Sequence, residues 1–366
     1  MKRFLSVFLA ILLLFTTVSI LTPGVSATAA AGDSSNTTVF DRVTQSLRTA
    51  FLRFFEWLRS LFSRKTAPEE IEIDTPPETS AAPTTTTAPP ESDPSVICDS
   101  RPSDPTEGTS AETTLPATET LAFRADWEYA SFSAIHTGSV TLYRSQAAQR
   151  KGRTVCVNAG HGTKDGDTQF TLCHPDGSPK VTGGSTAAGA IQATAVGGGT
   201  TMLDGTPEAQ VTLSLALLVK EKLLAAGYDV LMIRESDDVQ LDNIARTVFA
   251  NNCADCHIAL HYDSSTNDKG LFYCGVPDVE SYRNMEPVKS HFEAHTALGE
   301  ALLQGARDAG VKIYRTGRTD IDLTQTSYST VPSVDLEVGD RGSDYGAAAQ
   351  GKIADGIVRG VNAFFG

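Results

Sequence analysis

Three side chains beyond residue 150 could bind a divalent metal ion together: His161, Glu208 and His261. Two neutral imidazoles and one carboxylate are typical ligands of a catalytic zinc ion, because they leave its fourth coordination position open for water or substrate. The three residues are far apart in the sequence and do not form a compact motif. On pattern alone, each histidine could instead be a hydrogen-bonded residue near the end of a strand.

The sequence before each histidine predicts a strand. His161 follows a β-rich run at residues 154–158, and His261 follows a second run at 255–260. The carboxyl ends of parallel strands share one edge of a sheet, and α/β folds place their sites in the crevice outside that edge. We therefore expect the two imidazoles to lie there.

Glu208 is expected in the first turn of a helix. Thr206 predicts the N-cap and Pro207 the first helical residue. Between the first strand and this helix lies a Gly/Thr/Ala-rich stretch, residues 163–205, which has no hydrophobic periodicity. We interpret it as a surface insertion near the site, with a flexible point at Gly197–Gly199.

The rest of this region alternates apolar runs with helical patterns. The order of elements predicts an α/β fold, with a twisted, mostly parallel and possibly mixed sheet covered by helices on both faces. Beyond the elements named above, we expect strands at 229–234, 270–276, 311–314 and 331–338 and helices at 241–252, 289–309 and 353–365.

Six blocks in this region resemble, in order, those of the zinc-dependent N-acetylmuramoyl-L-alanine amidases of the Amidase_3 family. The resemblance extends over roughly residues 152–366, and six blocks in order are far more specific than any one of them. The blocks are VCVNAGHG at 155–162, TPEAQVTL at 206–213, GYDVLMIR at 227–234, LDNIARTVFAN at 241–251, ADCHIALH at 254–261 and VPSVDLEVG at 331–339.

The resemblance implies that His161, Glu208 and His261 bind Zn2+ and that Glu337 is the catalytic acid/base. The implied reaction is hydrolysis, by zinc-activated water, of the amide bond between N-acetylmuramic acid and L-alanine of the stem peptide in peptidoglycan. Glu337 would take the proton of the water and pass it to the leaving amine. Without the resemblance, Glu337 could simply pair with an arginine such as Arg246 or Arg341.

The sequence departs from the family pattern beside the expected site. Asn158 stands where aspartate is usual, and Tyr262 and Asp263 follow His261 where Ala-Asn is common. These residues could alter the orientation of the ligands or the preferred substrate. Two other functions therefore stay open: zinc-dependent hydrolysis of another peptide or amide bond of the wall, and a non-catalytic wall-binding protein on the same fold.

The composition divides the chain before this region into three further segments. Residues 1–27 combine Lys2 and Arg3 with an apolar run and small residues at the end, which is typical of a signal peptide and could also be an uncleaved anchor. Residues 39–65 predict an amphipathic helix, and residues 67–120 an acidic, Pro/Thr-rich disordered linker. Residues 152–366 are the expected zinc amidase domain, with 121–151 as its lead-in.

The expected partner is peptidoglycan, met outside the cell or at the cell wall after export. The helix at 39–65 carries arginines between its apolar residues, so it could contact a membrane surface, a partner helix or the catalytic domain. The formal net charge is −14, and most of it comes from the linker, so it gives no sign of nucleic-acid binding.

The six cysteines permit disulfides in an exported protein. Cys253 and Cys256 form a single C-x-x-C pair with no second pair, so a structural zinc site is not expected there. The remaining histidines, at 136, 174, 257, 291 and 295, are expected to be surface or packing residues.

Overall fold

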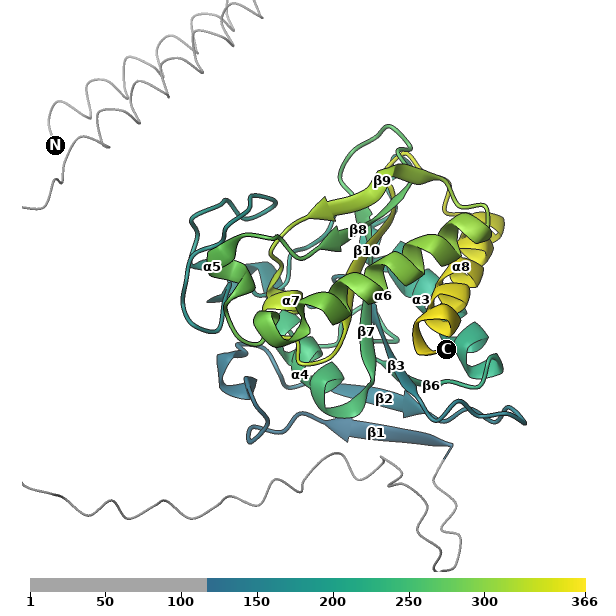
Figure 1. Cartoon of the computed structure of the whole chain (residues 1–366), viewed down its shortest axis with the longest axis horizontal. Coiled ribbons are helices and arrows are strands. Elements are labelled where there is room, and N and C mark those ends of the chain that lie inside the picture. Colours follow the sequence, from purple (N-terminus) through teal and green to yellow (C-terminus); the bar gives the residue numbers. More distant parts are fainter. Residues whose placement is uncertain (1–116) are drawn as a thin grey trace, which may run out of the picture. The chain divides into compact units, whose positions relative to one another are not determined.

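An eight-stranded mixed sheet forms the centre of residues 117–366, the part of the chain that the computed structural model describes (Figure 1). Its strand order is β1-β2-β6-β3-β7-β10-β8-β9. A short hairpin of β4 and β5 lies outside it. The strands are β1 Thr118–Ala122, β2 Ser139–Tyr143, β3 Thr154–Ala159, β4 Phe170–Leu172, β5 Gln192–Thr194, β6 Asp229–Met232, β7 Cys256–Asp263, β8 Leu271–Gly275, β9 Ile313–Asp320 and β10 Ser333–Asp340.

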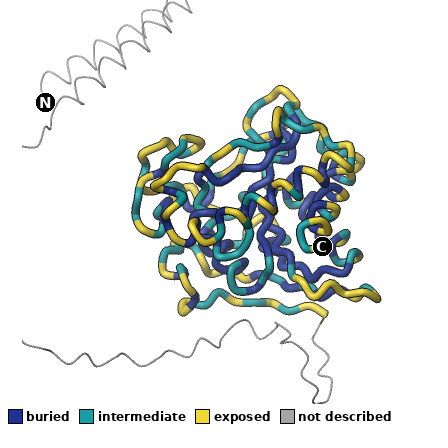
Figure 2. Tube along the Cα trace, viewed as in Figure 1, coloured by how far each residue is buried: buried dark blue, intermediate teal, exposed yellow. Residues whose placement is uncertain are grey.

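The four central strands, β6, β3, β7 and β10, are parallel to one another. Strand β8 joins this group antiparallel to β10, and β1 and β2 extend the opposite edge antiparallel. The central strands are buried along nearly their whole length, as Figure 2 shows, which matches their nearly continuous apolar sequences. The predicted mostly parallel, mixed α/β sheet is confirmed.

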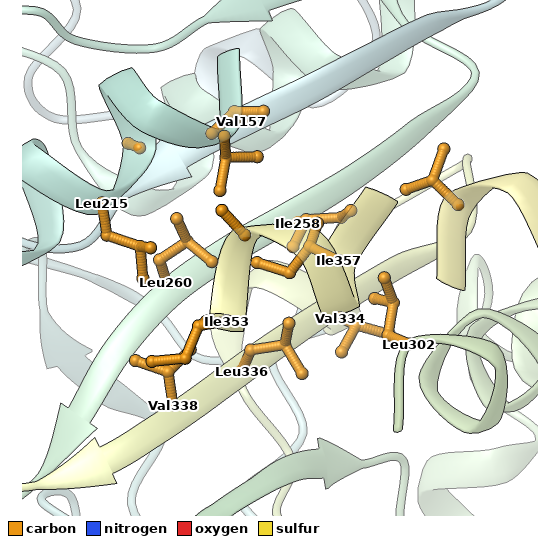
Figure 3. Close-up of a cluster of buried hydrophobic side chains, with 14 of the residues drawn as sticks. Val157, Leu215, Ile258, Leu260, Leu302, Val334, Leu336, Val338, Ile353 and Ile357 are labelled. Carbon is orange, nitrogen blue, oxygen red and sulfur yellow. The ribbon is translucent and has the colours of Figure 1, made fainter. Parts of the chain in front are cut away.

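Helices cover both faces of the sheet. Helices α3 (Glu208–Ala225), α6 (Val288–Asp308) and α8 (Ala347–Phe365) share a core with alternate residues of β3, β7 and β10, part of which Figure 3 shows. Helix α4 (Asn243–Cys253) packs with the opposite set of strand residues. The short helices are α5 (Glu280–Arg283), α7 (Thr324–Ser327), and the 3-10 turns Ala130–Phe132 and Gly166–Thr168.

Helix α3 starts differently from the sequence prediction. It begins at Glu208, Pro207 is the N-cap, and no side chain caps it, so the prediction of Thr206 as N-cap is wrong. The hydroxyl of Thr206 instead accepts a hydrogen bond from Tyr345 (3.1 Å). The amide of Glu208 donates to the carbonyl of Thr200 (3.0 Å), so another loop supplies the acceptor that a cap would have supplied.

The insertion at 163–205 is more ordered than the sequence suggests, because a buried carboxylate fixes it. Asp322 is only 1 % exposed. It accepts hydrogen bonds from His174 Nε2 (3.1 Å), Lys180 Nζ (3.1 Å) and the amide of Val181 (2.6 Å). Burial raises the pKa of Asp322, but the donors outweigh burial and hold it below its usual range. The insertion therefore has a buried polar anchor in addition to its few buried apolar side chains, such as Met202.

The expected signal peptide and amphipathic helix, and the linker up to residue 116, lie outside the described residues. Strand β1 begins at Thr118, within the range expected for the linker, and β1 and β2 make the lead-in part of the sheet. Within residues 117–366, no helix is both long and apolar enough to cross a membrane.

The cysteines of the described region differ in state. Cys253 is disulfide-bonded. The other four, Cys156, Cys173, Cys256 and Cys274, are buried free thiols. Cys253 and Cys256 are therefore not bonded to each other.

We predict that Asp322→Ala lowers the free energy of unfolding by about 3–5 kcal/mol, because it leaves buried Lys180 without its counter-charge. Urea denaturation followed by circular dichroism measures this loss. Asp320→Ala is the matched control: Asp320 is 42 % exposed and pairs with Arg318, so its loss should change stability by less than about 1 kcal/mol. Equal effects of the two substitutions would contradict the role of Asp322.

Candidate metal centre and active site

The structure brings the three predicted metal ligands together at one edge of the sheet. His161 follows β3, Glu208 is the first residue of α3, and His261 lies near the end of β7. His161 Nε2 lies 3.0 Å from Glu208 Oε1, and His261 Nδ1 lies 3.2 Å from the same oxygen. The two nitrogens are 3.1 Å apart. The three atoms thus form a nearly equilateral triangle.

The neighbours of these residues indicate that all three facing atoms carry lone pairs. His161 Nδ1 lies 2.7 Å from the carbonyl of Gly197 and must donate to it, which leaves Nε2 unprotonated. Burial raises the pKa of Glu208, but the contacts with His161 and His261 outweigh burial and hold the pKa below its usual value, so the group is a carboxylate. Three lone pairs at such distances repel one another, so the cluster favours a positive charge at its centre.

The pKa of His261 also indicates that the cluster favours a positive charge. Burial lowers its pKa, whereas the negative charge of Asp335 and the contacts with Glu208 raise it, to about 10 overall. The cluster therefore stabilises a cation, whether a proton or a metal ion.

The donor triangle fits zinc. Metal–ligand bonds of about 2.0–2.1 Å in a tetrahedron place two ligand atoms about 3.3 Å apart. The observed separations of 3.0–3.2 Å are close to that value. Two imidazole nitrogens and one carboxylate oxygen are also the donor types that zinc accepts.

Two buried arginines hold the loop that carries His161, which has a left-handed φ of 63°. Arg234 donates to the carbonyls of Ala159 (3.0 Å) and Gly160 (2.8 Å). Arg246 donates to the carbonyl of His161 (2.6 Å). Burial lowers the pKa of Arg234 to about 10 and that of Arg246 to about 9. These guanidinium groups fix a backbone conformation that would otherwise be strained.

Asn158, one of the departures from the family pattern, belongs to this network. Its amide oxygen accepts a hydrogen bond from Arg246 (3.1 Å), and its nitrogen lies 3.2 Å from Nε2 of His257. Burial, followed by the charge of Arg246, lowers the pKa of His257 to about 3. The neutral imidazole accepts the N–H of Asn158, a donor that an aspartate would lack.

The other two departures from the family pattern, Tyr262 and Asp263, make contacts that are independent of each other. The amide of Tyr262 donates to Glu208 Oε1 (2.9 Å). The carboxylate of Asp263 pairs with Lys269 (2.8 Å). Tyr262 thus supports a ligand through its backbone, which any residue at this position could do.

Glu337 lies beside the donor triangle. It is paired in register with His261 across β10 and β7. Its Oε2 is buried and has no hydrogen-bond partner among the described residues. Burial and the neighbouring charge of Asp335 raise its pKa well above the usual value. A carboxyl group whose pKa is raised in this way is suited to exchange a proton with a neighbouring group.

Neither arginine considered as a structural partner pairs with Glu337. Arg246 binds Asn158 and backbone carbonyls, and Arg341 donates to the carbonyl of Thr201. The hypothesis of an arginine pair is therefore wrong.

Asp335 was not among the site residues predicted from the sequence. It lies two residues before Glu337 on β10, so both side chains are on the same face of the sheet. Its Oδ2 lies 3.7 Å from His261 Nε2, and its Oδ1 has no hydrogen-bond partner among the described residues. The alternation of apolar and acidic residues in Val334-Asp335-Leu336-Glu337 was the sequence signal that could have placed Asp335 beside Glu337.

Cys274, Asp335 and Glu337 also bring potential ligand atoms within 4.8 Å of one another. Burial is the largest cause that raises the pKa of each of the three groups. For Cys274 it favours the protonated thiol, which binds metal ions poorly. The donor triangle is the better cation site.

The end of the insertion contacts two of the three ligands, which the sequence did not reveal. The carbonyl of Gly197 accepts from His161, and the amide of Thr200 donates to Glu208 Oε2 (2.8 Å). Gly199 has φ of +82°, and a Cβ there would lie 2.8 Å from Cδ2 of His161. The glycine run therefore allows close approach to a ligand at a fixed position.

Comparison with known proteins gives one family match. A family model described as N-acetylmuramoyl-L-alanine amidase, Amidase_3, matches residues 155–363. Comparison with curated proteins finds no match.

Solved structures of similar fold include Ami1 from Mycobacterium smegmatis, with 18 % identity, 60 % of this chain and 98 % of that chain covered, and a TM-score of 0.49. The apo form of Ami1 from Mycobacterium abscessus has 20 % identity, coverage of 59 % and 99 %, and a TM-score of 0.47. The catalytic domain of CwlV from Bacillus (Paenibacillus) polymyxa var. colistinus has 20 % identity, coverage of 58 % and 97 %, and a TM-score of 0.41.

We predict that Gly199→Ala weakens zinc binding by at least about tenfold, because the new methyl group displaces the ring of His161 and strains a left-handed residue. Chelator competition on the purified protein measures the affinity. Gly198→Ala is the matched control, since a Cβ at Gly198 meets nothing within 4 Å. Equal affinities of the two variants would contradict the steric argument.

Proposed function

The chain belongs to the Amidase_3 family of N-acetylmuramoyl-L-alanine amidases, and from that premise we propose the residues and the metal by which it hydrolyses peptidoglycan. His161, Glu208 and His261 hold Zn2+. Glu337 is the catalytic acid/base. The bond cleaved joins the lactyl group of N-acetylmuramic acid to L-alanine of the stem peptide.

One observation carries this proposal. Three donor atoms from separate elements converge at 3.0–3.2 Å beside Glu337, whose buried Oε2 has no hydrogen-bond partner among residues 117–366. A protein that only bound the wall would have no use for such a costly arrangement, because unpartnered buried carboxyl groups destabilise a fold. The arrangement therefore favours a hydrolase over a binding protein.

Zinc, when bound, would supply Lewis acidity that makes water acidic near neutral pH and polarises the scissile carbonyl. Residues of the protein hold the ligands in place and transfer the proton. The Gly197 carbonyl fixes the tautomer of His161, and the Thr200 amide fixes Glu208. Glu337 takes a proton from the attacking water and delivers it to the nitrogen of the leaving amine.

We also propose that the chain is exported, since its substrate class is the cell wall. The support lies in the sequence of residues 1–27, and the arginine-rich amphipathic pattern of 39–65 supports contact with an anionic membrane surface. A peptide of residues 33–66 should float with liposomes that contain anionic lipid. Failure to float would remove the membrane contact and leave export untouched.

Digestion of defined muropeptides tests the reaction itself. The purified protein should release stem peptides with free L-alanine amino ends, and a chelator should abolish this release until Zn2+ is restored. Glu337→Gln should retain zinc and lower kcat by about 100- to 10,000-fold, because proton transfer is lost while the ligands remain.

Glu293→Gln is a surface control for that variant, since Glu293 is 82 % exposed and pairs only with Arg283 among the described residues. It should leave the rate unchanged. Full activity of Glu337→Gln would refute its role. New ends other than L-alanine would show that a different bond of the wall is cleaved, and no turnover with zinc bound would indicate a binding protein.

A further inference from the structure

Asp335 is a buried carboxyl group beside the proposed zinc ligands that the proposed mechanism leaves unused. It is 9 % exposed and lies on the same face of β10 as Glu337. Three other buried aspartates behave differently. Asp242, Asp322 and Asp340 each accept several hydrogen bonds from loop amides or hydroxyl groups, whereas Oδ1 of Asp335 has no partner among the described residues.

The role of Asp335 follows from what His261 requires. Nδ1 of His261 faces His161 Nε2 at 3.1 Å and Glu208 Oε1 at 3.2 Å. To act as a ligand this nitrogen must be unprotonated, so the proton of the neutral ring must sit on Nε2. A neutral imidazole in that tautomer needs a negative or accepting group beside Nε2.

Asp335 supplies that group. Its Oδ2 lies 3.7 Å from His261 Nε2, too far for a hydrogen bond but near enough for its charge to act on that nitrogen. The pairing of Asp335 with Ala259, two residues before His261 on β7, fixes this placement. Among the described residues, no lysine or arginine is paired with Asp335, so its charge acts on His261 without competition.

We infer that Asp335 is a positioning residue of the metal centre: its carboxylate keeps the proton of His261 on Nε2 and turns the Nδ1 lone pair toward the metal. The inference rests on the proposed zinc site. His161 has a neutral outer partner, the Gly197 carbonyl, and His261 has a charged one. A charged partner makes the imidazole more basic and a stronger ligand.

Zinc affinity measured by competition with a chromophoric chelator tests the inference on the full chain. Asp335→Asn keeps the shape and an accepting oxygen but loses the charge, and Asp335→Leu loses both. We expect zinc to bind about tenfold more weakly to Asp335→Asn and up to about 100-fold more weakly to Asp335→Leu. Asp320→Asn, at an exposed position on β9, should bind zinc as the unaltered protein does.

A tautomer measurement separates positioning from a general structural effect. In the zinc-loaded protein labelled with nitrogen-15 in histidine, His261 should appear as the Nε2-protonated form. Circular dichroism shows whether each variant is folded, and if Asp335→Leu does not fold, Asp335→Asn decides. Unchanged zinc affinity in Asp335→Asn, or a proton on Nδ1 in the unaltered protein, would overturn the inference.

The variant His261→Ala distinguishes a failure of the inference about Asp335 from a failure of the proposed zinc site. If His261→Ala loses zinc while the Asp335 variants keep it, the zinc site stands and the inference falls. If His161→Ala, Glu208→Ala and His261→Ala all keep zinc affinity, the proposed site itself is wrong.

Discussion

The mutual approach of three electron-rich atoms is the constraint on which the rest of this domain depends. His161 Nε2, Glu208 Oε1 and His261 Nδ1 lie 3.0–3.2 Å apart, and without positive charge between them this arrangement is repulsive. The fold must therefore hold each of the three side chains firmly before any ion binds. Strand β7 holds His261 directly, since its pairing with Glu337 of β10 and the pairing of the preceding Leu260 with Ala159 of β3 fix its backbone. The other two ligands need additional support.

That support comes from buried charges used in two ways. The guanidinium groups of Arg234 and Arg246 bind backbone carbonyls around His161, and the carboxylate of Asp322 anchors the insertion whose end contacts His161 and Glu208. In these cases every charge is surrounded by complementary donors or acceptors, which offsets the cost of burial. Asp335 and Glu337 lack such donors within residues 117–366. This contrast supports the roles proposed for them in the chemistry of the site.

Much of this arrangement could be predicted from the sequence, because the relevant signals are local. Hydrophobic runs ending at His161 and His261 predicted strands, and the alternation of strands and helices predicted a parallel sheet whose edge collects the ligands. The start of α3 could not be predicted correctly, since the acceptor for Glu208 comes from Thr200 and the hydroxyl of Thr206 binds Tyr345. Asp322 anchors a segment more than a hundred residues earlier, a long-range contact that leaves no pattern in either segment. Asp335 lay within a recognised block, but apolar alternation emphasises Val334 and Leu336, which face the core.

The insertion at 163–205 contacts two residues of the proposed metal site. A loop that only covered a groove could change freely without affecting the ligands. Here the same segment supplies the Gly197 carbonyl to His161 and the Thr200 amide to Glu208, and places Gly199 against the imidazole. Its interior, at residues 174–182, is fixed through Asp322 to the loop that precedes α7. Any rearrangement of the insertion on binding a wall fragment must therefore move the two ligands or break the Asp322 anchor, so the geometry favours a rigid wall beside the metal centre over a mobile lid.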